Sequence, residues 1–422
     1  MGDGEVIDLI DNFYIAKPGA TAREVNEQLD KGKSIIFAPG IYRLEEPIYV
    51  KNPNTIVMGL GFATLIPTKA NSECALKVAD VDGVTITGFL FDTEWSSKEL
   101  LLVGERTSHV SHADNPTLLA DLFFRVGGVY TNAVNVDQCI VIKSNDVIGD
   151  HFWVWRADHG KGTGWRMNTS KIGIVVYGDN VSLYGMFNEH FQQYQLLWLG
   201  ENGKLFFYQC ETPYDPVNQD AFLSHKDPES GEQANGYSAY KVAVGIKHHY
   251  ASMLGIYDVF INTNNQKVQI RNSVEIPAGE EDVKVHHVCN VCISSLPYCG
   301  FTYVIGDKCK STYWTNQGEA NAGVSKRYAV PDFDGTMTDL VWKNDVHAPT
   351  DKETDHVTGI KNVNLDVPAT NGTVTLYNAS GMRIANFKNT GDVDMSGFTP
   401  GLYIVKITNN QGENIVRKVI KK

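Results

Sequence analysis

The chain has 422 residues, of which 42% are hydrophobic and 20% are charged. This length favours more than one domain, because single hydrophobic cores stop growing at about 250 to 300 residues. The 49 acidic and 37 basic residues give a net charge of −12 without a Lys/Arg-rich stripe, so the protein repels phosphate backbones and anionic lipids. Nucleic acid is therefore not expected as a partner, and neither is membrane insertion.

Neither a membrane-spanning helix nor an N-terminal signal peptide is expected from this sequence. No run of about 18 apolar residues is present that could form a membrane-spanning helix. The start, Met1 to Glu5, is acidic and lacks the basic and apolar regions of a signal peptide. We expect either a cytosolic protein or a secreted one whose signal peptide has been removed.

The seven cysteines form an odd set, so at least one thiol is free unless it pairs between chains. Cys289 and Cys292 have the spacing of a zinc-binding pair, but Cys299 and Cys309 follow at irregular distances, and no histidine stands at ligand spacing. Buried thiols or one or two disulfides are therefore favoured, and no metal site is predicted.

The first predicted element is a short amphipathic helix at 21–29. A strand pattern follows at 35–44, with a Pro39-Gly40 turn inside it, and the next strand pattern lies at 47–50. This order resembles the first coil of pectate-lyase-like β-helices. The resemblance implies that residues 18–33 form a cap over the open end of a solenoid.

From Ser34 to Thr312 the chain repeats short β-branched or aromatic runs, each followed by a turn of Asn, Asp or Gly. Two all-β architectures fit this pattern. A sandwich would place hairpin turns at intervals of about 8 to 12 residues, whereas a right-handed parallel β-helix repeats coils of about 20 to 30 residues.

Two similar segments favour the second of these architectures. Residues 178–190 and 200–211 both begin with Gly, an acidic residue and Asn, and glutamates stand 22 residues apart in them, at Glu189 and Glu211. An offset of that size is typical of one coil of a solenoid. We predict an all-β fold in which residues 1–345 form a single-stranded right-handed parallel β-helix.

Composition changes after this domain. Residues 346–357 are polar and aperiodic, which predicts a linker, and residues 358–422 contain strand patterns at 372–378 and 401–407 before a lysine-rich end. This order resembles the C-terminal sorting domain of the type IX secretion system of Bacteroidetes, a small β-sandwich. The resemblance implies an exported protein, either secreted or held at the cell surface. A generic appended β-sandwich is the alternative.

Stacking on consecutive coils would place Glu189 and Glu211 about 4.8 Å apart, the spacing of neighbouring strands. Like charges at that distance repel by a few kcal/mol, so one of the two pKa values should rise by about a unit or more. We assign the raised pKa, and the role of general acid, to Glu211, because Gln209 and Tyr214 offer it a partly apolar, hydrogen-bonding wall. The alternative is a solvated face on which each glutamate pairs with Lys or Arg.

Four ordered motifs extend this hypothesis. They resemble motifs of glycoside hydrolase family 55, β-1,3-glucanases with a β-helix fold, and they lie at 124–128, 155–159, 183–195 and 209–214. The resemblance implies an inverting reaction in which Glu211 is the general acid and Glu189 is a second important glutamate. Family members of this type carry two tandem β-helices, and this chain resembles the second. It departs from the family at Cys210, where Thr is expected, and at Asp215, where an aromatic residue is common.

Other polar and aromatic residues complete the predicted site. Asp158 is the candidate for holding the attacking water, with a structural ion pair as the alternative. The predicted substrate-binding residues share these motifs, and core or structural positions are the alternative for each: Gln209, Gln195, Tyr194, Tyr214, His159, His190, Trp155 and Arg156.

These features together predict a secreted glycoside hydrolase that cleaves a glucan-like polysaccharide, with β-1,3-glucan favoured. General acid catalysis by this mechanism needs no cofactor. The expected partners are the polysaccharide and the secretion machinery, and we expect a monomer. Two other functions are compatible with the sequence: a non-catalytic carbohydrate-binding or adhesion β-helix, and a polysaccharide lyase.

Overall fold

The structure is a computed structural model. It describes residues 6–105, 110–226, 229–261, 267–292, 299–305, 326–333, 345–350, 362–364, 373–378, 383–388, 392–394, 401–408 and 414–421. The chain divides into two compact units, Met1–Glu353 and Thr354–Lys422. No helix among these residues is long and apolar enough to cross a membrane.

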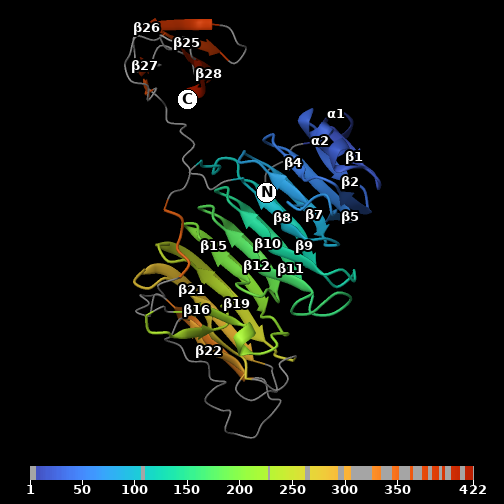
Figure 1. The fold of residues 1–422 in the computed structure, drawn as a ribbon, viewed down its shortest axis with the longest axis vertical. Helices are drawn as coiled ribbons and strands as arrows, with labels where there is room; N and C mark the ends of the chain where they lie inside the picture. Colours follow the sequence, from blue (N-terminus) through green and yellow to red (C-terminus); the bar gives the residue numbers. More distant parts are fainter. Residues whose placement is uncertain are drawn as a thin grey trace. The chain divides into compact units, whose positions relative to one another are not determined.

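Most of the first unit consists of two long sheets (Figure 1). The first contains β1 (Phe13–Ala16), β2 (Ser34–Phe37), β3 (Ile41–Leu44), β5 (Ile56–Pro67), β7 (Thr85–Phe91), β9 (Leu118–Val126), β11 (Ile148–Arg156), β13 (Ser182–Glu189), β15 (Gly203–Glu211), β19 (His248–Asp258), β21 (Asp282–Cys292) and β23 (Lys326–Phe333). The second contains β4 (Ile48–Val50), β6 (Leu76–Val78), β8 (Ser97–Val103), β10 (Val134–Ile142), β12 (Asn168–Val176), β14 (Leu196–Trp198), β18 (Tyr240–Val242), β20 (Gln269–Glu275) and β22 (Gly300–Ile305).

From β3 onward the chain alternates between these sheets, and neighbouring strands in each sheet are parallel, except that β23 runs antiparallel to β21. Strands that come from successive passes of the chain therefore lie side by side, as a parallel β-helix requires. The predicted fold class is confirmed. Three short elements lie outside the two sheets: η1 (Gln219–Ala221), β16 (Leu223–Lys226) and β17 (Gln233–Asn235).

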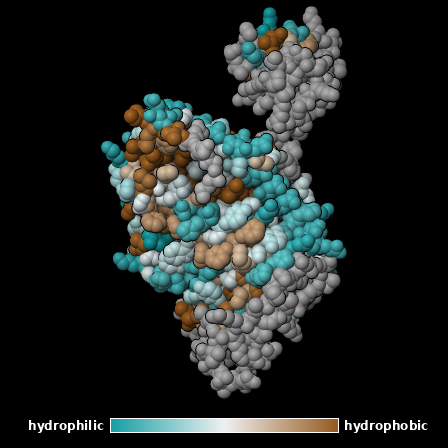
Figure 2. All heavy atoms as spheres, turned by 180° about the vertical axis from the view of Figure 1, so that it is seen from behind, coloured by the Kyte–Doolittle hydropathy of each residue, from teal (hydrophilic) through white to brown (hydrophobic). Residues whose placement is uncertain are grey.

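Two helices lie at the N-terminal end of the unit, α1 (Leu9–Asn12) and α2 (Ala22–Asp30). The predicted helix is α2, which begins at a capping box formed by Thr21 and Glu24. Its buried residues, Ala22, Val25 and Leu29, face β2 and β4 and cover the first coil. This cap region carries several exposed large hydrophobic residues, and Figure 2 shows hydrophobic residues gathered at this end of the unit.

A bend recurs at one position in successive coils of the first sheet. The residue there has a left-handed backbone conformation and is skipped in the strand register; examples are His151 (φ 58°), Gly185 (φ 65°) and Phe207 (φ 59°). Glycine adopts this conformation without strain, so Gly185 suits the position and the other side chains are tolerated at some cost. The bend divides each long strand into two arms, and the second arm ends at the site described below.

The interior of the β-helix is built from side chains that stack from coil to coil. In one such column Phe152, Met186, Tyr208, Leu254 and Val288 are register partners on successive strands, and all are buried. Alternate residues on each strand therefore face the core, and the residues between them face outward. This alternation fixes which polar residues can reach a substrate.

The six described cysteines form no disulfide with one another, and Cys309 lies outside the described residues. Cys292 is buried, whereas Cys289, three positions earlier on the same strand, faces the other side of the sheet and is partly exposed. The two sulfurs therefore do not converge as a zinc-binding pair would.

The second unit contains antiparallel strands, which agrees with the small β-sandwich that was predicted. A four-stranded sheet contains β26 (Arg383–Lys388), β25 (Thr373–Asn378), β28 (Gly401–Thr408) and β29 (Asn414–Lys421), and β24 (Asn362–Asn364) pairs with β27 (Asp392–Asp394). Part of the predicted linker, 351–357, lies outside the described residues, whereas residues 346–348 pair with Val244 at the edge of the β-helix.

Candidate active site

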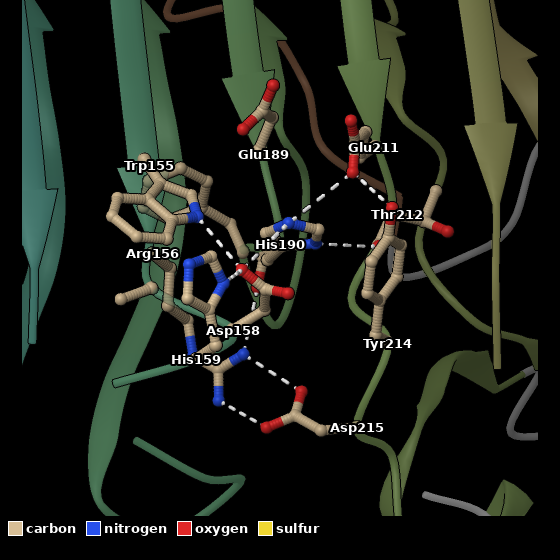
Figure 3. A network of polar contacts seen from close by, with 12 residues as sticks. Trp155, Arg156, Asp158, His159, Glu189, His190, Glu211, Thr212, Tyr214 and Asp215 are labelled. Carbon is tan, nitrogen blue, oxygen red and sulfur yellow. Dashed lines mark hydrogen bonds and ion pairs between the residues drawn. The ribbon is translucent and has the colours of Figure 1, made fainter. Parts of the chain in front are cut away.

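Glu189 and Glu211 are the last residues of β13 and β15, and they are register partners. The predicted stacking on consecutive coils is therefore confirmed. The same row continues to Trp155 on β11 and to Tyr257 on β19. Figure 3 shows the two carboxyl groups side by side on neighbouring strands, with Trp155 on one flank.

Glu189 is buried, with 9% of its surface exposed, and it accepts a hydrogen bond of 2.9 Å from Nε1 of Trp153. Burial raises its pKa to about 7, an effect that the Trp153 hydrogen bond opposes and the negative charges of Glu211 and Asp158 reinforce. The stacked pair thus includes a carboxyl group with a raised pKa, but this group is Glu189 and the main cause is desolvation. The role predicted for Glu211 stays a prediction.

Two phenols and an amide surround Glu211. The hydroxyl groups of Tyr214 and Tyr257 donate to its two carboxyl oxygens, and Nε2 of Gln209 lies 3.3 Å from Oε1. Among the described residues, neither Glu211 nor Glu189 forms an ion pair with Lys or Arg. The alternative of a solvated face with simple ion pairs is therefore wrong for this pair.

Gln209 links the site residues and keeps one free acceptor. Its Nε2 donates to the hydroxyl of Tyr257 at 2.7 Å, whereas its Oε1 is buried and has no hydrogen-bond partner among the described residues. A buried acceptor without a partner is costly. A water molecule or a sugar hydroxyl would satisfy it.

His190 follows Glu189 in a left-handed conformation (φ 70°), which ends the strand and turns the imidazole under the carboxyl pair. Its Nδ1 lies 3.1 Å from the carbonyl oxygen of Thr212, which can only accept, so Nδ1 carries the hydrogen. The other nitrogen, Nε2, lies 3.6 Å from Oε2 of Glu211 and 3.7 Å from Oδ1 of Asp158. Burial lowers the pKa of His190, so the neutral ring presents a lone pair to these carboxyl groups.

Asp158 lies in the turn after β11, on the other side of His190 (Figure 3). Its Oδ1 accepts from Nε1 of Trp155 at 3.3 Å and contacts Nδ1 of the exposed His159 at 2.8 Å. Two contacts of 3.7 and 3.6 Å through His190 place Oδ1 of Asp158 at most 7.3 Å from Oε2 of Glu211. Asp158 therefore belongs to the same cluster, as predicted from its motif.

Arg156 does not face the substrate side. It is fully buried, and its guanidinium donates to both carboxyl oxygens of Asp215 at 2.9 Å and to the carbonyl oxygens of Asn168, Gly164 and His190. Its five N–H groups are all used, so the prediction that Arg156 binds sugar is replaced by a positioning role. The same pair accounts for Asp215, the acid that stands where an aromatic residue was expected.

Gln195 and Tyr194 are also structural. Gln195 is buried, and its amide bonds to the backbone of Phe191 at 2.7 Å in both directions, which closes the turn after His190. Tyr194 is buried with its hydroxyl 3.0 Å from Nε2 of His225, in another part of the unit. Within the described part of the chain neither side chain contacts the carboxyl pair, and both are too buried to make the predicted contacts with substrate.

The structure also brings in two residues that are not among the predicted site residues. Tyr257 contacts Glu211 although it lies 46 residues later, because the coil between them contains the insertion with η1, β16 and β17. Trp153 holds Glu189 and stacks on Trp155 at 5.5 Å, leaving 41% of its surface exposed beside the site. Its position two residues before Trp155, on the same side of the strand, is the signal that could have identified it.

Comparisons with known proteins agree with this geometry. Residues 13–211 match the LAM55 pectate lyase-like domain, and residues 357–422 match the secretion system C-terminal sorting domain. A protein described as an exo-beta-1,3-glucanase, from Streptomyces sp. (strain SirexAA-E / ActE), is 41% identical over 292 residues, which cover 69% of this chain and 46% of that protein.

Two solved structures of sacteLam55A from Streptomyces sp. SirexAA-E are similar in fold. A variant in complex with glucose has a TM-score of 0.68 at 37% identity, and another structure of the protein has a TM-score of 0.67 at 38% identity. Each comparison covers 77% of this chain and 55% of the other. The chain thus spans about half the length of the relatives it matches.

The match to the LAM55 model ends at Glu211, so both glutamates lie inside it, and the sorting-domain match coincides with the second compact unit. The chain therefore carries a LAM55 pectate lyase-like domain followed by a secretion system C-terminal sorting domain.

Proposed function

We propose that this protein is a secreted glycoside hydrolase that cleaves β-1,3-glucan at the Glu189–Glu211 pair. The observation that carries the proposal is a stacked pair of carboxyl groups, one of them with a pKa of about 7, enclosed by hydrogen-bonding aromatic residues and free of Lys or Arg partners among the described residues. A similar protein is described as an exo-beta-1,3-glucanase.

In this proposal the pair retains a proton near neutral pH and delivers it to the glycosidic oxygen. Interacting carboxyl groups titrate as a unit, so the raised pKa of Glu189 is a property of the pair and its surroundings. Glu211 donates this proton, because its side chain is more exposed than that of Glu189 and is oriented by the phenols of Tyr214 and Tyr257. The leaving sugar departs as an alcohol, and the carboxylate left behind is stabilised by the same phenols.

The attacking water is held by acceptors next to the pair. Gln209 offers the unpartnered Oε1, and Asp158 offers a carboxylate on the far side of His190. Inverting glycosidases place their two carboxyl groups about 6.5 to 9.5 Å apart to leave room for this water. The upper limit of 7.3 Å between Asp158 and Glu211 allows that spacing, and we assign the base to Asp158.

Aromatic side chains supply the surface on which sugar rings are held. Trp153 is exposed over part of its surface, Trp155 is stacked on it, and Tyr214 lies on the other side of the carboxyl pair. Apolar sugar faces pack on aromatic rings while the hydroxyl groups find polar partners. His159, exposed beside Trp155, is placed to offer one such partner.

The sorting domain supports secretion or attachment at the cell surface, where polysaccharide is encountered. We therefore propose that the secretion machinery recognises the second unit and that the first unit carries the activity.

The direct test is hydrolysis of laminarin, a β-1,3-glucan, beside β-1,4-linked and mixed-linkage glucans, with the products separated by chromatography. We expect sugar release from laminarin by the wild type, and the anomer first formed should be inverted when followed by NMR. Glu27→Gln, on the exposed face of α2, is the matched control and should behave as wild type. No release from any glucan, with binding retained, would refute hydrolysis and indicate a carbohydrate-binding protein.

A further inference from the structure

A second buried ionic cluster lies away from the carboxyl pair, on the wall formed by the second sheet. Its centre is Lys241 of β18, whose Nζ lies 2.7 Å from Oε2 of Glu275 and 2.8 Å from Oδ1 of Asp345. Nε2 of His225 lies 3.4 Å from the same oxygen of Glu275. At least nine-tenths of each of these four side chains is buried.

The backbone brings the three groups at the centre together. Lys241 and Glu275 are register partners on neighbouring coils, so their side chains project side by side from β18 and β20. Asp345 lies on the segment that follows the β-helix. Two backbone hydrogen bonds, of 3.0 and 2.8 Å, connect this segment to Val244. The backbone pairing of Lys241 with Glu275, and of residues 346–348 with Val244, thus holds the amine in contact with both carboxyl groups.

Aromatic rings enclose this cluster on the side of Tyr194. The Tyr194 hydroxyl lies 3.0 Å from Nε2 of His225, and its ring packs against that of Tyr237 at 5.1 Å, which in turn packs against Phe222 at 6.3 Å. Groups in such surroundings lose most of their hydration, and buried charges are costly even when paired. A bond between Lys241 and one of the two carboxyl groups would remove two of these buried charges.

The unreacted cluster is an ion pair. Burial lowers the pKa of Lys241 and the two carboxylates raise it, with a net upward shift, whereas burial raises the pKa of Glu275 and Lys241 lowers it, to about 2. An ammonium and a carboxylate contain all the atoms of an amide and one water. No oxidant, reductant or cofactor is needed to join them.

We propose that Lys241 and Asp345 condense into an intramolecular isopeptide bond, with Glu275 as the proton carrier. Glu275 takes a proton from the Nζ ammonium in an uphill step that limits the rate, because the pKa of Lys241 is raised and that of Glu275 is lowered. The freed amine then attacks the side-chain carbonyl carbon of Asp345. Glu275 then returns the proton to the departing oxygen, which leaves as water together with the second proton of the amine. An N–C bond forms, a C–O bond breaks, and the ammonium and carboxylate charges are both lost.

A metal ion is the other ligand that such a group could hold, since His225, Glu275 and Asp345 place their ligand atoms within 4.8 Å of one another. Lys241 argues against this, because its ammonium contacts both carboxylates, where a cation would bind. The proposed bond would instead tie the wall of the β-helix to the segment that leads toward the sorting domain. It would close a loop from residue 241 to residue 345.

Intact-mass spectrometry of the purified, denatured full-length chain tests the proposal without any variant. We expect a mass lower than the sequence mass by one water molecule. After digestion with trypsin, residues 227–247 should be joined to residues 344–352, with the chain uncut after Lys241. A wild-type mass equal to the sequence mass, or a water loss that maps elsewhere, would overturn the proposal.

Two variants distinguish the proposed isopeptide bond from the ion pair that Lys241 forms in the structure. Lys241→Arg keeps the positive charge but lacks the amine, so it should show its full sequence mass while remaining folded by circular dichroism. Glu275→Gln keeps the size of the side chain and should leave Lys241 and Asp345 unlinked. A cross-linked peptide in Glu275→Gln would overturn the role of Glu275 as the proton carrier.

Discussion

Glu189→Gln should stabilise the fold at alkaline pH and much less at acidic pH. The pKa of Glu189 is about 7 in the folded protein, compared with 4.5 for an ordinary glutamate. The folded state thus binds this proton more tightly than the unfolded state, so the stability of the wild type falls as pH rises through this window. Glutamine resembles the protonated acid and has no such dependence.

The size of the effect follows from the shift in pKa. Each pKa unit corresponds to about 1.4 kcal/mol, so the difference in unfolding free energy between variant and wild type should grow by about 3 kcal/mol from about pH 4 to about pH 8. The side chain is 9% exposed, so solvent screening is slight. The hydrogen bond from Trp153 can still be accepted by the amide oxygen of the variant.

Urea unfolding followed by tryptophan fluorescence measures this difference. All seven tryptophans lie before residue 354, so the signal reports on the β-helix unit alone. The control is Glu27→Gln, an identical chemical change at an exposed position, which should show no growing difference. An equal effect of Glu189→Gln at both pH values would refute the assignment of the raised pKa to this residue.

Three further changes test the surroundings of the pair. Trp153→Phe removes a hydrogen-bond donor that favours the ionised form of Glu189, so the pKa of Glu189 should rise. The pH at which kcat/KM on laminarin falls on the alkaline side should then rise by about one unit, and an unchanged pH profile would contradict this. Asp215→Asn leaves a buried guanidinium unpaired and should cost about 3 to 5 kcal/mol in urea unfolding, whereas a loss below about 1 kcal/mol would count against it. Tyr257→Phe removes a donor to Glu211 and should lower kcat by about tenfold or more, and an unchanged kcat would rule out this contact in catalysis.

The stacking of Glu189 on Glu211 was predictable because a parallel β-helix converts a fixed sequence offset into strand register. Both glutamates end their strands, which are 8 and 9 residues long, and no insertion separates them. Tyr257 was not predictable in this way, since the next coil contains extra elements between residues 212 and 247 and its length follows no repeat.

The direction in which side chains point at the ends of strands was also not predictable from the sequence. Arg156 follows Trp155 on the same strand, yet Trp155 faces outward and Arg156 points inward to meet Asp215. A motif contains both residues without telling which one is buried. The pKa of Glu189 has a similar origin: its sequence neighbours do not reveal that Trp153 and the strand on either side exclude water from it.

The most direct test of the proposed chemistry is the rate of laminarin hydrolysis by the wild type, Glu211→Gln and Glu27→Gln. Calorimetry shows separately that each protein binds laminarin. General acid catalysis contributes about 10² to 10⁴ in rate. We predict that Glu211→Gln binds laminarin but releases sugar at least about 100-fold more slowly, while Glu27→Gln matches the wild type. Release by Glu211→Gln at the wild-type rate would contradict the assignment of Glu211 as the acid.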